Sequence, residues 1–244
     1  MNLTILWITL ITILATILRI IGIDKAGGLW NDEYISWSIA NIPLSKAFLK
    51  GIASQCHMPF YYLYLKVFSH ISNNDLFLRF SSVIPAMISV PVMYLVGRTK
   101  SKLCGILCAL FVVTSSFLIY FSQEVRFYSI LFLFSALSLL FTLRIVKKQN
   151  KHNLIGLIVS NCLILFTHTI GFVYVFFNLL FVSIILKNKE NFKKVFIYTW
   201  SILTLTLALT SPLLLRIFTT VSFSQWETFS LAIYFAWLIK PQYS

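Results

Sequence analysis

The chain has 244 residues, of which 59% are hydrophobic and only 11% are charged. A soluble domain is nearer half apolar and a quarter charged, so this composition excludes an ordinary soluble fold and indicates a protein embedded in a lipid bilayer. The formal net charge of +13 does not indicate nucleic-acid binding, because the basic residues lie in short loops between apolar runs. We therefore expect a lipid environment and no nucleic-acid partner.

The first apolar run extends from Leu3 to Ile23. At 1.5 Å per residue this run spans about 32 Å, which is enough to cross a bilayer. It lacks a basic N-terminal region and a small-residue cleavage site, so a retained helix is favoured over a signal peptide. Arg19 lies near the end of the run, and we expect its side chain to extend to the lipid headgroups.

A long amphipathic segment, residues 24–78, follows the first run. Within it, the stretch from Phe60 to Phe68 is aromatic and apolar but carries Lys66. This stretch is too short to span a membrane alone, so it predicts a helix lying in the membrane interface.

Six further apolar runs complete an all-α integral membrane protein with about seven transmembrane helices. We separate the run 153–169 from the run 170–186 near His168 and Gly171, because one helix of their joint length would be too long for a membrane. Residues 1–216 then form one transmembrane module, and residues 217–244 form an outer tail or, at Phe229–Ile239, part of an eighth helix. The six runs lie at about 79–97, 103–121, 127–143, 153–169, 170–186 and 195–215.

The charges alternate between the two sides of this predicted bundle. The loops 98–102, 144–152 and 187–194 hold eleven of the 20 basic residues and one of the seven acids. Because cytoplasmic loops are enriched in lysine and arginine, these loops and the N-terminus are predicted to be cytoplasmic in a multi-pass protein of the cell membrane. Segment 24–78 is then outside. Six acids also fall outside: Asp24, Asp32, Glu33, Asp75, Glu124 and Glu227.

Asp32 and Glu33 form a carboxylate pair just beyond the first helix, flanked by Trp30 and Tyr34. Paired carboxylates can supply a general base, because mutual repulsion and partial burial raise one pKa. They can also bind a divalent cation. An ordinary solvated acidic loop is the alternative interpretation.

Glu124 and Arg126 lie in the short turn between the third and fourth predicted spans, followed by Tyr128. Apolar runs directly precede and follow this turn, so the two charges are expected at the membrane boundary. Ionisable groups at that position usually face protein or a water-filled cavity. The alternative is a structural ion pair that closes a tight helical hairpin.

Two histidines are weaker candidates. His57 precedes Pro59 by two residues and could donate to a phosphate or carry a proton, or could simply be exposed. His168 lies between two threonines at the outer end of a predicted span, where it could instead only hydrogen-bond neighbouring helices.

All four candidate groups fall on the outer side. A membrane-level cavity with carboxylates, an arginine and a histidine is suited to breaking the sugar–phosphate bond of a lipid-linked donor. The attacking hydroxyl needs a base, and the leaving phosphate needs cations, for which arginine is a planar two-pronged donor.

The order of these motifs resembles one known family. The motifs are Asp32-Glu33 after a first membrane helix, the segments 57–62 and 120–128, Leu78-Arg79-Phe80-Ser81 before a helix ending at Gly97-Arg98, and Thr167-His168. Together they resemble the GT-C fold glycosyltransferases of the protein O-mannosyltransferase superfamily, in its bacterial and archaeal branch, over about residues 1–215.

This resemblance implies transfer of a sugar, with inversion, from a polyprenyl-phosphate donor to a glycan, lipid or protein acceptor. By analogy Asp32 is the base, with Glu33 beside it, and His57 lies near the donor phosphate. The remaining substrate-binding positions would be Glu124, Arg126, Tyr128 and His168. Whether a divalent cation takes part, on Asp32, Glu33 or Glu124, stays open.

Family members are usually about twice this length, so an inactive truncated remnant or a membrane subunit is an alternative function. A transporter is a further alternative. That function predicts helices broken by glycine or proline and inverted repeats, with charges at the bilayer midplane. Here the ionisable residues gather at one face instead.

Overall fold

The computed structural model describes residues 3–24, 27–55 and 57–220, and its regular structure over those ranges is helical throughout. The predicted partial eighth helix, Phe229–Ile239, lies outside the described residues. The helices are α1 (Leu3–Ile20), α2 (Asn31–Asn41), α3 (Lys46–Ser54), α4 (Pro59–Ile71), α5 (Asp75–Arg98), α6 (Lys102–Thr114), α7 (Ser116–Ser122), α8 (Tyr128–Lys147), α9 (Lys151–Thr167), α10 (Ile170–Leu186) and α11 (Phe192–Thr220).

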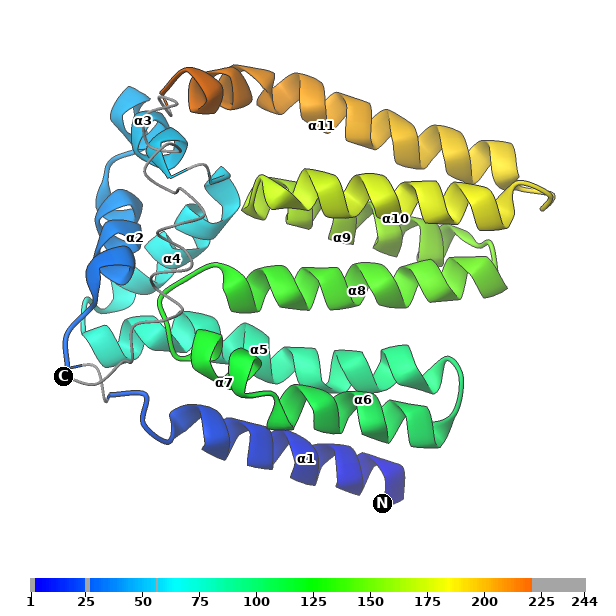
Figure 1. The fold of residues 1–244 in the computed structure, drawn as a ribbon, viewed down its shortest axis with the longest axis horizontal. Coiled ribbons are helices and arrows are strands. Elements are labelled where there is room, and N and C mark those ends of the chain that lie inside the picture. The colour runs from blue at the N-terminus through cyan, green and yellow to red at the C-terminus, as the bar shows by residue number, and fades with distance from the viewer. Residues whose placement is uncertain (1–2, 25–26, 56, 221–244) are drawn as a thin grey trace, which may run out of the picture.

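The long helices lie side by side in one layered bundle, and α2, α3 and α4 lie across one end of it (Figure 1). The connections α5–α6, α8–α9 and α10–α11, which carry the basic residues, gather at the opposite end (Figure 1). The charges that alternate along the sequence between two predicted sides therefore lie at two distinct ends of the bundle.

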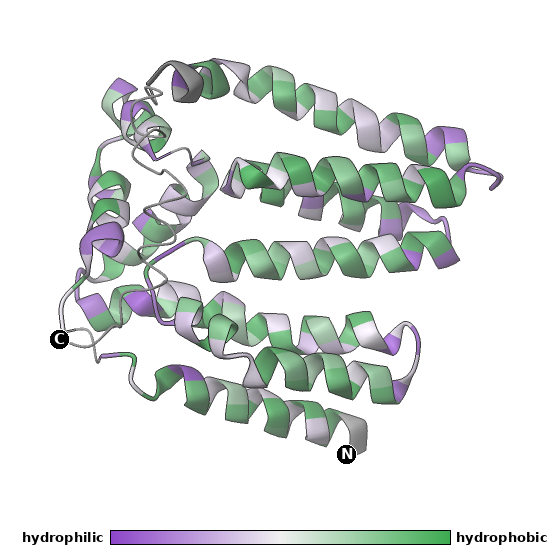
Figure 2. Cartoon of the chain, viewed as in Figure 1, coloured by the Kyte–Doolittle hydropathy of each residue, from purple (hydrophilic) through white to green (hydrophobic). Residues whose placement is uncertain are grey.

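Hydrophobic residues predominate along the middle of the long helices, and hydrophilic residues are concentrated towards the two ends of the bundle (Figure 2). By length and composition, α5, α8 and α11 (over Phe192–Arg216) can each cross a membrane, and the bent pair α6–α7 would make a fourth span. Helices α1, α9 and α10 are apolar but shorter. The predicted runs thus form helices, while the count of seven crossings stays a prediction. Of the three long helices, α5 is the most buried and α11 the least.

The predicted single helix over 103–121 is wrong, because the chain bends by 57° between α6 and α7. Ser115 has an extended conformation, and its side chain accepts a hydrogen bond from the Leu118 N–H to start the second helix. The break leaves carbonyl groups at the end of α6 without helical partners. Arg19 donates to one of them, the Val112 oxygen, at 2.9 Å.

Arg19 therefore does not extend to the headgroups, contrary to the sequence prediction. Its side chain is fully buried between α1 and α6, and it also donates to the Ala15 oxygen. A carbonyl group without a hydrogen bond in an apolar interior costs free energy, so the bond from Arg19 stabilises the buried position of its guanidinium.

The segment between α1 and α5 forms three packed helices. Helix α4 starts with Pro59, a residue that suits the first helical turn, and buries Tyr61, Tyr62 and Leu65 against its neighbours. Its opposite face leaves Val67 exposed, so α4 combines protein contacts with the apolar outer face expected of an interfacial helix. The segment ends earlier than predicted, because α5 already begins at Asp75 behind an Asn74 cap.

A glycine allows α5 and α6 to pack closely against each other. A Cβ added to Gly97 would lie 2.3 Å from the Cys104 oxygen and 2.8 Å from the Cys108 sulfur, so glycine lets α5 and α6 touch. The predicted break near His168 is confirmed, since α9 ends at Thr167 and α10 begins at Ile170.

Candidate functional site

Glu33, in the first turn of α2, is the most highly bonded acid of the site. The alternative of an ordinary solvated acidic loop does not hold, because Asp32 and Glu33 form the first turn of α2, where the helix dipole favours carboxylates. The side chain of Glu33 is 1% exposed and pairs with the equally buried Arg79 of α5. Two backbone amides complete its shell: Trp30 N–H donates to Oε2 at 3.1 Å and Val125 N–H donates to Oε1 at 2.8 Å.

Arg79 ties this shell to the rest of the bundle end. It donates to both Glu33 oxygens, at 3.3 and 3.2 Å. It also donates to the backbone oxygens of Ile23 and Gly28, at 2.6 and 2.9 Å. The pair therefore joins four segments, namely the link after α1, the start of α2, helix α5 and the turn before α8. A buried pair with this many bonds is costly to break.

Asp32 points to a different partner. Its Oδ2 lies 3.5 Å from Nη2 of Arg126, and 39% of its side chain is exposed. Nη1 of Arg126 donates to the Asp32 carbonyl oxygen and to the Ser36 hydroxyl, both at 3.3 Å. Arg126 itself is buried, and its Nε has no hydrogen-bond partner. An accessible carboxylate thus lies against a buried guanidinium.

The structure does not contain the ion pair considered for Glu124 and Arg126. The ion pairs at this site are instead Glu33–Arg79 and Asp32–Arg126. Glu124 is 7% exposed and instead hydrogen-bonds Tyr120, and its Oε2 has no partner. Burial raises the pKa of the Glu124 carboxyl, and the hydrogen bond from Tyr120 opposes that shift.

His57 and His168 lie together although 110 residues separate them. An isolated antiparallel bridge joins the two residues, and their ring centroids are 4.8 Å apart. Nδ1 of His57 lies 2.6 Å from the Tyr62 hydroxyl, and Nδ1 of His168 accepts the Ile170 N–H at 3.0 Å. Phe127, next to Arg126, packs on both rings.

Both histidines are neutral near pH 7. Burial lowers the pKa of His57 to about 2, assisted by His168 and the positive charge of Arg126. Burial and Arg126 also lower the pKa of His168 to about 4. With its Nδ1 as an acceptor, a neutral His168 carries its proton on Nε2 and can donate it in a hydrogen bond.

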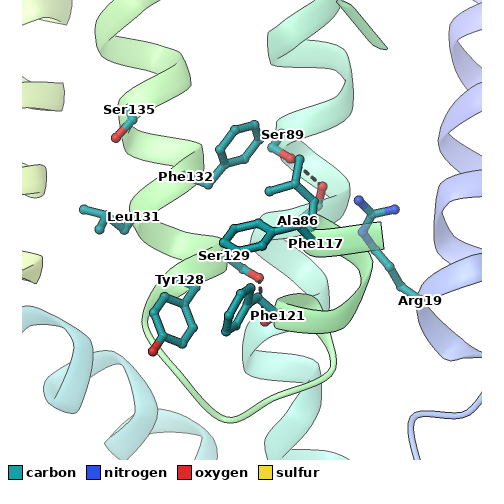
Figure 3. Close-up of a pocket in the computed structure, with 11 residues that line it drawn as sticks. Arg19, Ala86, Ser89, Phe117, Phe121, Tyr128, Ser129, Leu131, Phe132 and Ser135 are labelled. Atoms are coloured by element: carbon teal, nitrogen blue, oxygen red, sulfur yellow. Dashed lines mark hydrogen bonds between the residues drawn. The ribbon is translucent and has the colours of Figure 1, made fainter. Parts of the chain in front are cut away.

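Tyr128 connects the site to a cavity inside the bundle. The Arg126 guanidinium lies 5.8 Å from the Tyr128 ring centroid, and this ring also lines a cavity of about 240 Å³. Phe117 and Phe121 of α7 form another wall, and Arg19 lies at its far side (Figure 3). The cavity is almost wholly apolar and lies beside α5 and α8, two helices long enough to cross a membrane.

Asp32, Glu33 and Glu124 are the carboxylates that could hold a divalent cation. Within the described residues, no three His, Cys, Asp or Glu side chains gather as a metal cluster. Both Glu33 oxygens already accept hydrogen bonds from the protein, which leaves Asp32 and Glu124 as the carboxylates with free oxygen capacity.

Sequence patterns indicated most of this site but not its pairing. Arg79 was part of a motif, yet its role as partner of Glu33 was not predicted. A lone arginine near the start of an apolar helix is a usable signal, because burial there requires an acid. The His57–His168 contact has no local signal, since it depends on the packing of α4 on α9.

Over the described residues, an all-helical bundle with membrane-length apolar helices, and an acid and arginine site at one end, defines an integral membrane protein with a polar site at one end of its bundle. The sequence profile of one family, described as dolichyl-phosphate-mannose-protein mannosyltransferase, matches residues 56–215. The chain belongs to this family and is a membrane glycosyltransferase of the mannosyltransferase type. The match includes His57, Arg79, Arg126 and His168. Comparisons with curated proteins and with solved structures find no match.

Proposed function

We propose that this protein transfers a sugar from a polyprenyl-phosphate donor to an acceptor hydroxyl on the non-cytoplasmic face, with inversion at the anomeric carbon. The observation that carries this proposal is the accessible Asp32 carboxylate, held by buried Arg126 on a rigid base of Glu33 and Arg79. This arrangement lies near the bundle end that α2–α4 cover, away from the basic connections (Figure 1).

Asp32 is the better candidate for the general base. Glu33 accepts four hydrogen bonds and is enclosed, so it has neither access nor free capacity for an incoming proton. Asp32 has more than a third of its side chain exposed. In the proposed step it takes the proton of the acceptor hydroxyl while that oxygen bonds to the anomeric carbon. The bond from that carbon to the phosphate oxygen breaks, and the polyprenyl phosphate leaves with the electron pair.

Arg126 is the proposed contact for the donor phosphate. Its buried Nε–H has no partner, and a guanidinium in a low-dielectric site attracts phosphate strongly. His168, neutral and with its proton on Nε2, can add a further hydrogen bond. The apolar cavity lined by Tyr128 lies next to Arg126 and suits part of the donor's lipid tail. A glycan, lipid or protein hydroxyl would be the acceptor.

Replacement of Arg126 by lysine tests the donor class. Lysine keeps the charge but loses the planar set of donors, so affinity for polyprenyl phosphate should fall about ten- to a hundredfold, as for loss of a charge-assisted hydrogen bond. Binding is measured on purified protein in nanodiscs, with Arg126→Ala as the stronger variant.

Arg144→Lys is the matched control. Arg144 lies at the other end of α8, also beside an aromatic ring, and should bind polyprenyl phosphate as the unmodified protein does. Equal affinity in the Arg126 and Arg144 variants would remove Arg126 from the donor site. No binding to the unmodified protein would contradict the proposed donor class.

A further inference from the structure

A second cavity, of about 330 Å³, is lined in part by residues that are close to Asp32 and Arg126 in the chain but not by those two residues. Its volume is in the range of small-ligand sites. The Glu33–Arg79 pair forms one wall. The link between α1 and α2 and the segment 120–124 form the others. The residues that give it chemical character are Trp30, Glu33, Arg79, Tyr120, Gln123 and Glu124.

Glu124 is the unexplained group in this cavity. It is more than nine-tenths buried, yet its Oε2 has no hydrogen-bond partner. A buried carboxyl oxygen without a donor costs free energy, unless a ligand supplies one. Tyr120 hydrogen-bonds the same carboxyl, and the Gln123 amide is fixed by bonds to the Arg19 and Ile21 carbonyl oxygens. The surrounding wall is therefore rigid around an unmet acceptor.

Two aromatic side chains at this cavity are open to ligands. Trp30 is 44% exposed and Tyr120 is 58% exposed, although both line the cavity. A sugar ring presents C–H groups on one face and hydroxyl groups around its edge. Aromatic faces suit the first, because they carry partial negative charge, and a carboxyl suits the second.

We propose that this cavity binds a sugar ring, with Glu124 accepting from ring hydroxyls and with Trp30 and Tyr120 packing on its C–H face. The inference deepens the proposed function by adding a sugar subsite next to the base. Trp30 and Glu33 flank Asp32 along the chain, and Glu124 precedes Arg126 by two residues. The bound sugar is therefore adjacent to Asp32, and it belongs either to the acceptor or to the donor.

The test is binding of free methyl glycosides of mannose, glucose and galactose to protein in nanodiscs, followed by saturation-transfer NMR. At least one glycoside should bind the unmodified protein. Glu124→Ala should weaken that affinity about ten- to a hundredfold, because a buried hydroxyl of the sugar is left without its acceptor. Trp30→Ala should weaken it about two- to tenfold, and Trp30→Phe should restore most of the loss, since it keeps an aromatic face.

Trp7→Ala is the matched control, because Trp7 is a similarly exposed tryptophan in α1 that lies outside the cavity, and it should bind as the unmodified protein does. Thermal stability of each variant in detergent separates lost binding from lost folding. Absence of binding by all three glycosides would overturn the inference. So would equal affinity in folded Trp30→Ala, Glu124→Ala and Trp7→Ala.

Addition of saturating polyprenyl-phosphate-mannose distinguishes the two sources of the sugar. If it displaces the methyl glycoside, the cavity holds the donor sugar; if the glycoside still binds, the cavity holds the acceptor. Because glycoside binding requires no transfer, its failure is separate from failure of the Arg126 donor-binding test.

Discussion

At the scale of single residues, two adjacent acids have different surroundings. Glu33 is enclosed by Arg79 and two backbone amides, whereas Asp32 is partly exposed beside Arg126. Glu33 therefore serves best as a positioning residue: its bonds fix the first turn of α2, and with it the place of Asp32. The motif Asp-Glu alone does not reveal this division, because both partners are distant in sequence.

Removal of the Glu33 charge should destabilise the protein. Glu33→Gln leaves Arg79 as a buried cation without a counter-charge, and breaking such a pair typically costs about 3–5 kcal/mol. Asp32→Asn is the matched control, because Asp32 is more exposed and should affect thermal stability little. Thermal unfolding in detergent measures both variants. If Glu33→Gln and Asp32→Asn unfold at the same temperature, the Glu33–Arg79 pair does not hold the bundle end together.

At the scale of helices, hydropathy predicted where elements occur but not how long or straight they are. The bend at Ser115 interrupts an apolar run that reads as continuous. Its cause is a serine cap together with Arg19, which meets a carbonyl left open by the break. A sliding pattern of apolar residues cannot show such a contact, since α1 and α6 are far apart in the chain.

Labelling of two connections tests the orientation of the bundle in the membrane. The proposed topology places the α2–α3 link outside and the α10–α11 link inside, because the latter lies in a basic loop. In a cysteine-free background, Ser45→Cys should react with an impermeant thiol reagent on intact cells, and Asn188→Cys should react only after lysis. Both positions are exposed. The reverse pattern would place Asp32 on the cytoplasmic side.

At the scale of the whole molecule, the site is an assembly of distant segments. Sequence motifs indicated Asp32, Glu124, Arg126 and the histidines as candidates, and the order of motifs predicted the family, which the profile match confirms. The contacts themselves were not predictable. Arg126 bonds a residue 94 positions away, and this pairing depends on how α2 packs over the turn before α8. A local sequence pattern predicts where helices form, but it does not predict which distant residues come into contact.

Donor consumption by reconstituted protein tests whether this protein is a glycosyltransferase that uses Asp32 as its base. Proteoliposomes receive radiolabelled polyprenyl-phosphate-mannose with sugar, lipid and peptide acceptors, and release of polyprenyl phosphate is followed. The unmodified protein should consume the donor. Asp32→Asn should be slower by about a hundred- to ten-thousandfold, as expected for loss of a positioned general base. Asp24→Asn, which removes the charge of an exposed acid in the link between α1 and α2, should match the unmodified protein. Equal rates for Asp32→Asn and Asp24→Asn, or no consumption by the unmodified protein, would contradict the account.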